Sequence, residues 1–479
     1  MNRRMILYMV GQMIKLESAL LCLPAIVSLI YRERCFAAFL VTIGITLVLG
    51  FALTLVFKPR TRVIYAKEGF IIVALAWLAL SFFGSLPFVI SGEIPYFPDA
   101  FFETVSGFTT TGSSILRDVE ALSRGMLFWR SFTHWVGGMG VLVFIMAIMP
   151  TGDRSIHILR AEVPGPVVGK LVPRLKDTAK ILYLIYLAMT AITAALLMFG
   201  GMSVFESFVH AFGAAGTGGF GIKADSIASY NPYIQWVLTI AMLMFGLNFN
   251  LYYLCLIRRF KSVLKSHELW CYLGMVMASV ALITYNIYPI YHTFSDSLRF
   301  SAFQVSSIVT TTGYATADFN AWPDLSKGIL FTLMFIGGCA GSTAGGFKLS
   351  RVMLLFKMIR RELARMLHPR SVGVIKTDGK RVDDSTINGV GTYLALYTVA
   401  LFVIFLILSF EPFGILTNFT AAVTCFNNVG PGFGMVGPAG NFADYSALSK
   451  FVLSAAMLLG RLEIYPLLLA FSPSTWSKR

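Results

Sequence analysis

The sequence has few charged residues and few cysteines for its length. Only 13% of its 479 residues are Asp, Glu, Lys or Arg, whereas 56% are apolar, and the mean hydropathy is +0.73. This composition excludes a water-soluble protein and is typical of a chain embedded in a lipid bilayer. The six cysteines include no CxxC pair, which argues against a disulfide framework or a metal site.

Motifs of enzymes are also missing. The sequence contains no recognisable nucleophile, metal cage or phosphate loop, and a membrane enzyme would need His, Asp or Glu residues converging at one depth. Residues 216–221 (GTGGFG) match the spacing of a dinucleotide-binding turn, but that turn has meaning only after a β-strand. We therefore expect no enzyme activity, no bound cofactor and no nucleic-acid partner.

Ten apolar stretches come close to or exceed the ~20 residues that a helix needs to cross the hydrocarbon core of a bilayer. Arg3 and Arg4 precede the first stretch, and no small-residue cleavage site follows it, so we expect a retained first helix. The ten predicted spans are residues 13–30, 35–57, 68–90, 125–149, 180–200, 234–257, 269–290, 328–366, 388–410 and 448–471.

The charges indicate how the chain is oriented. With the N-terminus inside, 28 of the 39 Lys and Arg residues fall on one side, which the positive-inside rule places in the cytoplasm together with both termini. The carboxylates gather on or near the other side, where a collar of negative charge would concentrate cations. They are Glu93, Asp99, Glu103, Asp118, Glu120, Glu206, Asp225, Asp296, Asp318, Asp324, Glu411 and Asp444.

Four short segments between the spans resemble one another. Residues 100–114, 204–221, 296–315 and 415–434 are too short to cross a membrane, and each ends in a Thr/Gly or Asn/Gly turn. The turns read FTTTGSS, AAGTGGFG, VTTTGYAT and FNNVGPGFG, and they align on Gly112, Gly219, Gly313 and Gly430. The sequence therefore predicts four repeats of helix, pore loop and helix around one pseudo-fourfold pore, preceded by two N-terminal helices. The expected boundaries are 1–57 for the helix pair and 58–178, 179–265, 266–385 and 386–479 for the repeats.

Irregular backbone at membrane depth is tolerated only inside protein or beside water. Four such loops on one side predict a shared aqueous pathway, in which carbonyl oxygens replace the water shell of a monovalent cation. Glycine supplies the positive φ that a run of aligned carbonyls requires. The expected ion-binding residues are Thr110, Thr111, Gly112, Thr217, Gly218, Gly219, Thr311, Thr312, Gly313, Asn428, Val429 and Gly430.

Several motifs together resemble the Trk/Ktr/HKT superfamily of potassium transporters, most closely its bacterial TrkH/TrkG type, over essentially the whole chain. They are VSGFTTTGSS, TTTGYAT, NNVGPGFG, GGCAGSTAGGFK and GRLEIYPLLLAF. The resemblance implies potassium uptake across the bacterial inner membrane by a homodimer, with a cytosolic nucleotide-binding regulatory subunit of TrkA type. Glycine at position 112 goes with potassium preference in this superfamily. The glycine-rich second turn departs from the pattern and keeps a sodium-permeable or sodium-coupled relative as the alternative.

The predicted span 328–366 is almost twice the length of one crossing and is rich in glycine at its middle. Close packing of small residues is one interpretation. A flexible intramembrane loop that acts as a gate is the other, and the resemblance supports it. The expected gate residues are Gly337, Gly338, Gly341, Ser342, Thr343, Gly345, Gly346, Lys348 and Arg461.

Three further features leave alternatives open. Arg461 lies ~20 Å into the last span, where it either pins a neighbouring helix through backbone carbonyls or forms an electrostatic barrier beside the gate; Glu463, two residues on, cannot face it. His134 and His210 suggest either proton coupling or hydrogen-bonded packing. The basic stretch 360–384 suits lipid headgroups or an acidic face of the regulatory subunit.

Overall fold

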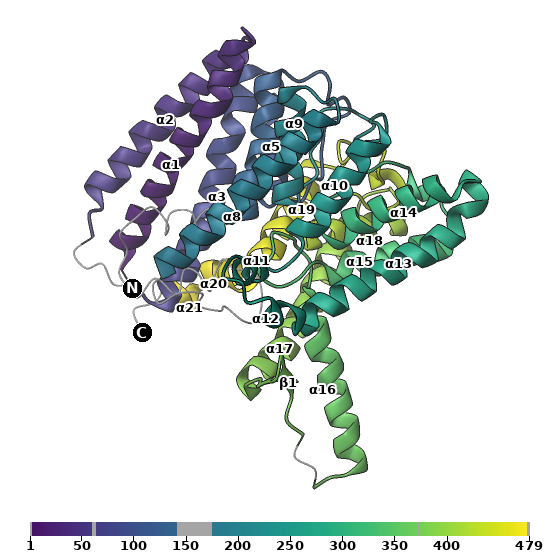
Figure 1. Ribbon diagram of the computed structural model, residues 1–479. Coiled ribbons are helices and arrows are strands. Elements are labelled where there is room, and N and C mark those ends of the chain that lie inside the picture. The colour runs from purple at the N-terminus through teal and green to yellow at the C-terminus, as the bar shows by residue number, and fades with distance from the viewer. Residues whose placement is uncertain (1, 60–63, 141–174, 371–372, 477–479) are drawn as a thin grey trace.

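The computed structural model describes residues 2–59, 64–140, 175–370 and 373–476. The chain forms a bundle of helices, and its N- and C-terminal ends lie close together at one side of this bundle (Figure 1). One helix, α16, projects beyond the bundle. Residues 141–149 of the predicted span 125–149 lie outside the described residues.

The first two helices pack against each other as a separate pair at the edge of the bundle (Figure 1). They are α1 (Arg3–Ile30) and α2 (Cys35–Val56). Gly11 and Gly50 face each other across the pair, because a methyl group on either would lie 3.1–3.2 Å from the other's carbonyl oxygen. The opposite face of α2 exposes large apolar side chains such as Val48 and Leu55, as expected of a helix that faces lipid.

The rest of the chain repeats one plan four times: a long helix, a short helix and a second helix. The first unit contains α3 (Ala66–Ser91), α4 (Phe97–Phe108) and α5 (Arg124–Gly138). The second contains α8 (Leu175–Phe199), α9 (Val204–Gly216), α10 (Pro232–Phe245), α11 (Phe249–Leu256) and α12 (Phe260–Leu264). The third contains α13 (His267–Tyr291), α14 (Phe294–Val309), η1 (Phe319–Ala321), α15 (Asp324–Ile336) and α16 (Leu349–Leu367). The fourth contains α17 (Asp384–Leu408), α18 (Ile415–Asn427), η2 (Gly434–Val436), α19 (Ala447–Arg461), α20 (Tyr465–Phe471) and α21 (Pro473–Trp476).

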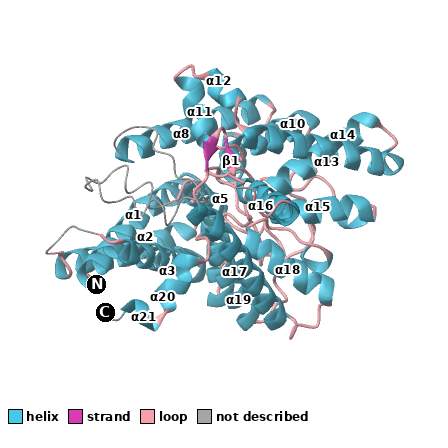
Figure 2. Cartoon of the chain, turned by 90° about the horizontal axis from the view of Figure 1, so that it is seen from below, coloured by secondary structure: helices cyan, strands magenta, loops and turns pink. Residues whose placement is uncertain are grey.

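This arrangement confirms the predicted fold class. Seen from below, the helices surround a centre that is filled by loops (Figure 2). In the described part of the chain the strands are confined to one small antiparallel hairpin, β1 (Lys376–Thr377) with β2 (Lys380–Arg381), between α16 and α17.

Several predicted membrane spans are broken in the described part of the chain. Among the described residues, six helices are long and apolar enough to cross a bilayer, or seven if the bent pair α10 and α11 counts as one span. The sequence predicted continuous spans at 234–257 and 448–471. The first is bent by 90° at residues 246–248, and the second is divided between α19 and α20 at Glu463 and Ile464, whose φ angles are +56° and +67°. The predicted break in span 328–366 separates α15 from α16.

Candidate ion pathway

The four short helices α4, α9, α14 and α18 each lead into a three-residue segment, which we call a glycine turn. The glycine turns are residues 110–112, 217–219, 311–313 and 428–430. Their first residues, Thr110, Thr217, Thr311 and Asn428, have φ of 55–56°, and their glycines have φ of 78–103°. The middle residues are not left-handed. Alternating backbone of this kind places successive N–H groups on one side and therefore the carbonyl oxygens on the other.

The glycine turns form a closed ring in chain order. A methyl group added to any of the four glycines would collide with the middle carbonyl of the next turn. Gly112 faces the carbonyl oxygen of Gly218, Gly219 that of Thr312, Gly313 that of Val429, and Gly430 that of Thr111. All four glycines line one cavity of about 110 Å³ at the end of the ring. The structure thus brings the twelve predicted ion-binding residues together around one axis.

Threonine side chains support the first and third glycine turns. Thr109 and Thr111 share a hydrogen bond of 2.8 Å between their hydroxyls, and Thr310 and Thr312 share an equivalent bond of 2.8 Å. The amide of Asn428 in the fourth turn donates to Thr111 Oγ1 at 3.0 Å and so joins the fourth turn to the first. The second turn has glycine at its middle position, 218, where the first and third turns have Thr111 and Thr312.

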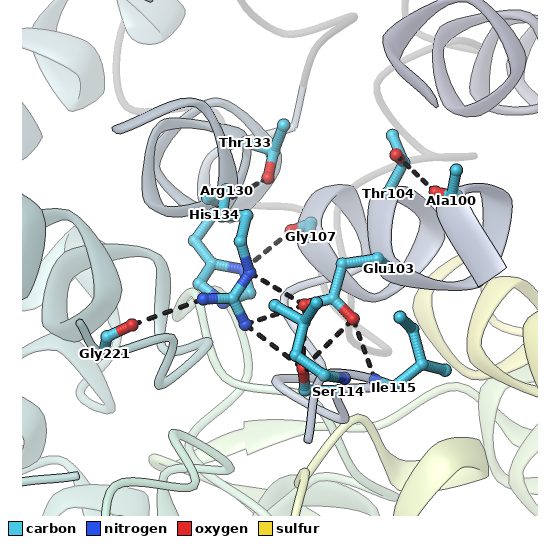
Figure 3. A network of polar contacts seen from close by, with 11 residues as sticks. Ala100, Glu103, Thr104, Gly107, Ser114, Ile115, Arg130, Thr133, His134 and Gly221 are labelled. Carbon is cyan, nitrogen blue, oxygen red and sulfur yellow. Dashed lines mark hydrogen bonds and ion pairs between the residues drawn. The ribbon is translucent and has the colours of Figure 1, made fainter. Parts of the chain in front are cut away.

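A buried ion pair between Glu103 and Arg130 contacts residues just beyond the first two glycine turns (Figure 3). Arg130 of α5 contacts Glu103 Oε1 through Nε at 2.8 Å and through Nη2 at 2.7 Å, and both side chains are at most 2% exposed. The other carboxylate oxygen of Glu103 accepts the Ile115 N–H at 2.9 Å. Arg130 Nη1 also donates to the Gly221 carbonyl oxygen at 3.3 Å.

This network removes some members from the predicted acidic collar, whereas others, such as Asp118 and Glu120, are exposed. Glu103 does not face water, and Asp99 is paired with Lys450 at 2.6 Å. Glu93 accepts bonds from the N–H and hydroxyl of Ser123 at 2.9 and 2.7 Å. These carboxylates hold the fold together, because nearby groups satisfy them. The sequence reasoning also missed Arg130, although a lone arginine inside a predicted span indicates a functional or structural site.

The expected gate residues 337–348 form an irregular segment between α15 and α16, which we call the central loop. Three bonds tie it to the break between α10 and α11: Cys339 N–H donates to Gly246 O at 3.0 Å, Phe249 N–H to Gly341 O at 3.0 Å, and Thr343 Oγ1 to Phe245 O at 3.2 Å. A fourth bond reaches the ring, where Gly345 N–H donates to Thr311 Oγ1 at 2.6 Å. Gly345 of the central loop lies next to Thr311 and Asn428, which are the first residues of the third and fourth turns. The cavity lies at the last residues of the turns, the glycines. The central loop therefore covers the end of the ring opposite the cavity.

Arg461 fixes the central loop to two other units. Its guanidinium donates to the carbonyl oxygens of Thr343 at 2.8 Å, Gly137 at 2.5 Å and Gly138 at 2.8 Å. Glu463 is paired instead with Arg351 at 2.6 Å, so the two neighbouring charges have different partners, as expected. Lys348 is also buried and donates to the Ala344 carbonyl.

The space around these charges is closed. The cavity lined by Gly345, Lys348, Arg461 and Glu463 holds about 10 Å³, which is at the lower limit for one water molecule. His134 and His210 are buried, and each places Nδ1 near a backbone carbonyl oxygen, that of Gly107 at 2.7 Å and that of Glu206 at 2.8 Å. This geometry favours the packing interpretation of both histidines.

The long apolar helices, the four-unit bundle and the ring of carbonyl-bearing turns define a multi-pass membrane protein built around one pore. The sequence model of the TrkH family, described as "Cation transport protein", matches residues 34–478, and the chain belongs to this family. It is 36% identical to the Trk system potassium uptake protein TrkH of Salmonella typhimurium over 99% of this chain and 100% of that one. It is 33% identical to TrkG of Escherichia coli K12, with coverage of 99% and 98%. The crystal structure of the potassium transporter TrkH from Vibrio parahaemolyticus superimposes with a TM-score of 0.90 at 32% identity, over all of both chains.

Proposed function

We propose that the protein takes up potassium ions across the bacterial inner membrane and that the four glycine turns are its selectivity filter. The observation that carries this proposal is the closed ring, in which each of the four glycines lies against the middle carbonyl oxygen of the next turn and all four line one cavity. Carbonyl oxygens are the ligands that replace the hydration shell of potassium in such filters. The relatives named above, which are potassium uptake proteins and a potassium transporter, support the choice of ion.

We further propose that the central loop is the gate. It lies against the ring at Thr311, it is buried, and Arg461 and Lys348 hold it closed through backbone carbonyls. An opened loop would connect the ring to the side of the bundle from which α16 projects (Figure 1). A buried cation beside the path also opposes passage of other cations while the loop is closed.

The side from which α16 projects is, in this proposal, the cytoplasm, with both termini on it. Basic residues concentrate there by the positive-inside rule. α16 carries a stripe of exposed apolar side chains at helical spacing, Phe356, Ile359, Leu363 and Met366, which supports a homodimer contact. The basic residues of 360–384 support docking of an acidic surface on a nucleotide-binding regulatory subunit of TrkA type, or of lipid headgroups.

One observation favours the alternative, a sodium-permeable transporter. The second glycine turn lacks the hydroxyl pair that joins Thr109 to Thr111 and Thr310 to Thr312. The fourth turn, with Asn428 and Val429, lacks this pair as well and is joined to the first turn through the Asn428 amide. A ring whose quarters are supported differently would hold its carbonyl oxygens at less uniform spacing.

The test is growth of a potassium-uptake-deficient bacterium at low external potassium, with the wild-type chain and Gly112→Ser compared at equal membrane expression. We expect rescue by the wild type and loss of rescue with serine, because its Cβ would collide with the Gly218 carbonyl. Failure of the wild type to rescue growth would contradict the proposal. Parallel measurement of ²²Na⁺ and ⁸⁶Rb⁺ uptake separates the sodium alternative from potassium preference.

A further inference from the structure

The second glycine turn has almost no side chains of its own with which to hold its shape. Positions 216, 218, 219 and 221 are glycine, and the Thr217 hydroxyl donates to the adjacent Gly216 carbonyl oxygen, at 2.6 Å. Phe220 is the one large side chain in the segment, and it is buried. Because glycine is the most flexible residue, a turn of this composition needs support from elsewhere.

The Tyr314 hydroxyl of the third unit donates to the Phe220 carbonyl oxygen at 3.2 Å. Side-chain support comes from α5 of the first unit. The His134 ring fills the space where a side chain at position 218 would lie. Phe220 packs against two residues of α5: the His134 ring, with centroids 4.2 Å apart, and the Arg130 guanidinium, 3.9 Å from the ring centroid. Arg130 and His134 are four residues apart and share one helix face. The one anchoring side chain of the second turn therefore lies between them.

Glu103 fixes Arg130 in this position. Two N–H groups of the guanidinium contact Glu103 Oε1, while Nη1 reaches the Gly221 carbonyl just beyond the second turn. Glu103 in turn accepts bonds from the Ser114 hydroxyl at 2.9 Å and the Ile115 N–H, just beyond the first turn. A planar guanidinium can make these bonds together, whereas an ammonium cannot.

The equivalent position differs in every unit. Nine residues before each aligned glycine stand Glu103, His210, Gln304 and Ala421. Gln304 donates to the Ala317 carbonyl at 3.1 Å, within its own unit. Among these four residues, all of which the structure describes, Glu103 alone holds a charged partner that reaches the neighbouring turn.

We propose that Glu103, Arg130 and His134 form a brace that positions the second glycine turn, so that discrimination between potassium and sodium depends on an ion pair contributed by the first unit. These three are positioning residues, since they act through Phe220 and the Gly221 carbonyl. The inference rests on the proposed function, in which the ring is the filter. The brace replaces the threonine hydroxyls that the second turn lacks, and it holds that quarter of the ring at the spacing of the others.

The test uses the full-length protein in proteoliposomes, with ⁸⁶Rb⁺ and ²²Na⁺ fluxes measured on the same preparation. Glu103→Gln keeps the shape of the side chain but removes its negative charge. Arg130→Lys keeps the positive charge but removes the planar guanidinium with its several N–H donors. We expect each to lower the Rb⁺/Na⁺ flux ratio about tenfold, equivalent to ~1.4 kcal/mol, while Rb⁺ flux persists. Glu103→Gln combined with Arg130→Lys should lower the ratio no further than the larger single change, because the two residues act as one unit.

The matched control is Arg117→Gln with Asp444→Asn. That ion pair also joins two units, at 2.5 Å, but its side chains are 75% and 51% exposed. We expect an unchanged ratio. An unchanged ratio in Glu103→Gln or Arg130→Lys, in protein that elutes as the wild type does in size-exclusion chromatography, would overturn the brace. Absence of Rb⁺ flux in the wild type would instead defeat the proposed function. Phe220→Leu is a second arm that leaves the ion pair intact, and it should lower the ratio in the same way.

Discussion

The glycine turns and the central loop are both irregular, glycine-rich and buried, yet they are held in different ways. Each glycine turn contacts the backbone of the next, and the contacts close into a ring that occurs in all four units. The central loop occurs in one unit and depends on separate contacts: Thr311 of its own unit, Arg461 of the fourth unit and the break at Gly246 in the second unit. Because each glycine turn contacts the next, one turn cannot change its conformation without disturbing the adjacent turns. A segment held by a few individual hydrogen bonds can move when those bonds break. This difference supports the proposal that the ring is the filter and the central loop is the gate.

The largest expected effect comes from adding one methyl group to the ring. In Gly219→Ala the methyl group would collide with the Thr312 carbonyl, and alanine is strained at a φ of +78°. Together these penalties reach ~3 kcal/mol or more, so we expect ⁸⁶Rb⁺ uptake to fall on the order of 100-fold. Gly274→Ala in α13 is the control, because a methyl group there meets no atom within 4 Å. Wild-type uptake by Gly219→Ala would show that the ring is not the filter.

Loosening the central loop should raise ion flux, whereas the change in the ring lowers it. Arg461→Gln removes a charged donor that binds three carbonyls in two other units. Hydrogen bonds from charged groups contribute ~1.5–3 kcal/mol, so we expect basal flux without a regulatory subunit to rise about 10- to 100-fold. Lys327→Gln, whose partner Asp324 is almost fully exposed, serves as the charge-matched control. A fall in basal flux of correctly folded Arg461→Gln would contradict the gate.

Much of this comparison could be predicted from the sequence, because the signals are local. The repeated Thr/Gly and Asn/Gly turns indicated the ring, and five glycines within ten residues indicated the central loop. The breaks at residues 246–248 and 462–464 could not be predicted in the same way. The Gly246 carbonyl oxygen accepts the Cys339 N–H and Glu463 is paired with Arg351, and both partners are more than 90 residues away in the sequence.

The partners of the charged residues could not be predicted from the sequence either. Counting carboxylates placed Asp99 in a solvated collar, but Asp99 is paired with Lys450, which lies 351 residues away in the sequence. Hydropathy could flag Arg130 as a charge inside a span, but it could not identify Glu103 as its partner or Phe220 as its neighbour. Local pattern locates irregular backbone, whereas the partners that stabilise it depend on how distant helices pack.

The smallest predicted effect concerns the single bond between the ring and the central loop. Thr311→Val keeps the shape of the side chain but removes the oxygen that accepts the Gly345 N–H at 2.6 Å. A neutral hydrogen bond contributes about 0.5–1.5 kcal/mol, so we expect basal ⁸⁶Rb⁺ flux to rise roughly two- to tenfold as the loop loosens. Thr311→Ser retains the hydroxyl and loses only a methyl group, and it should behave as the wild type. Equal effects of valine and serine would mean that the methyl group, and not the bond to the central loop, is responsible; the ring and the loop would then be coupled by packing alone.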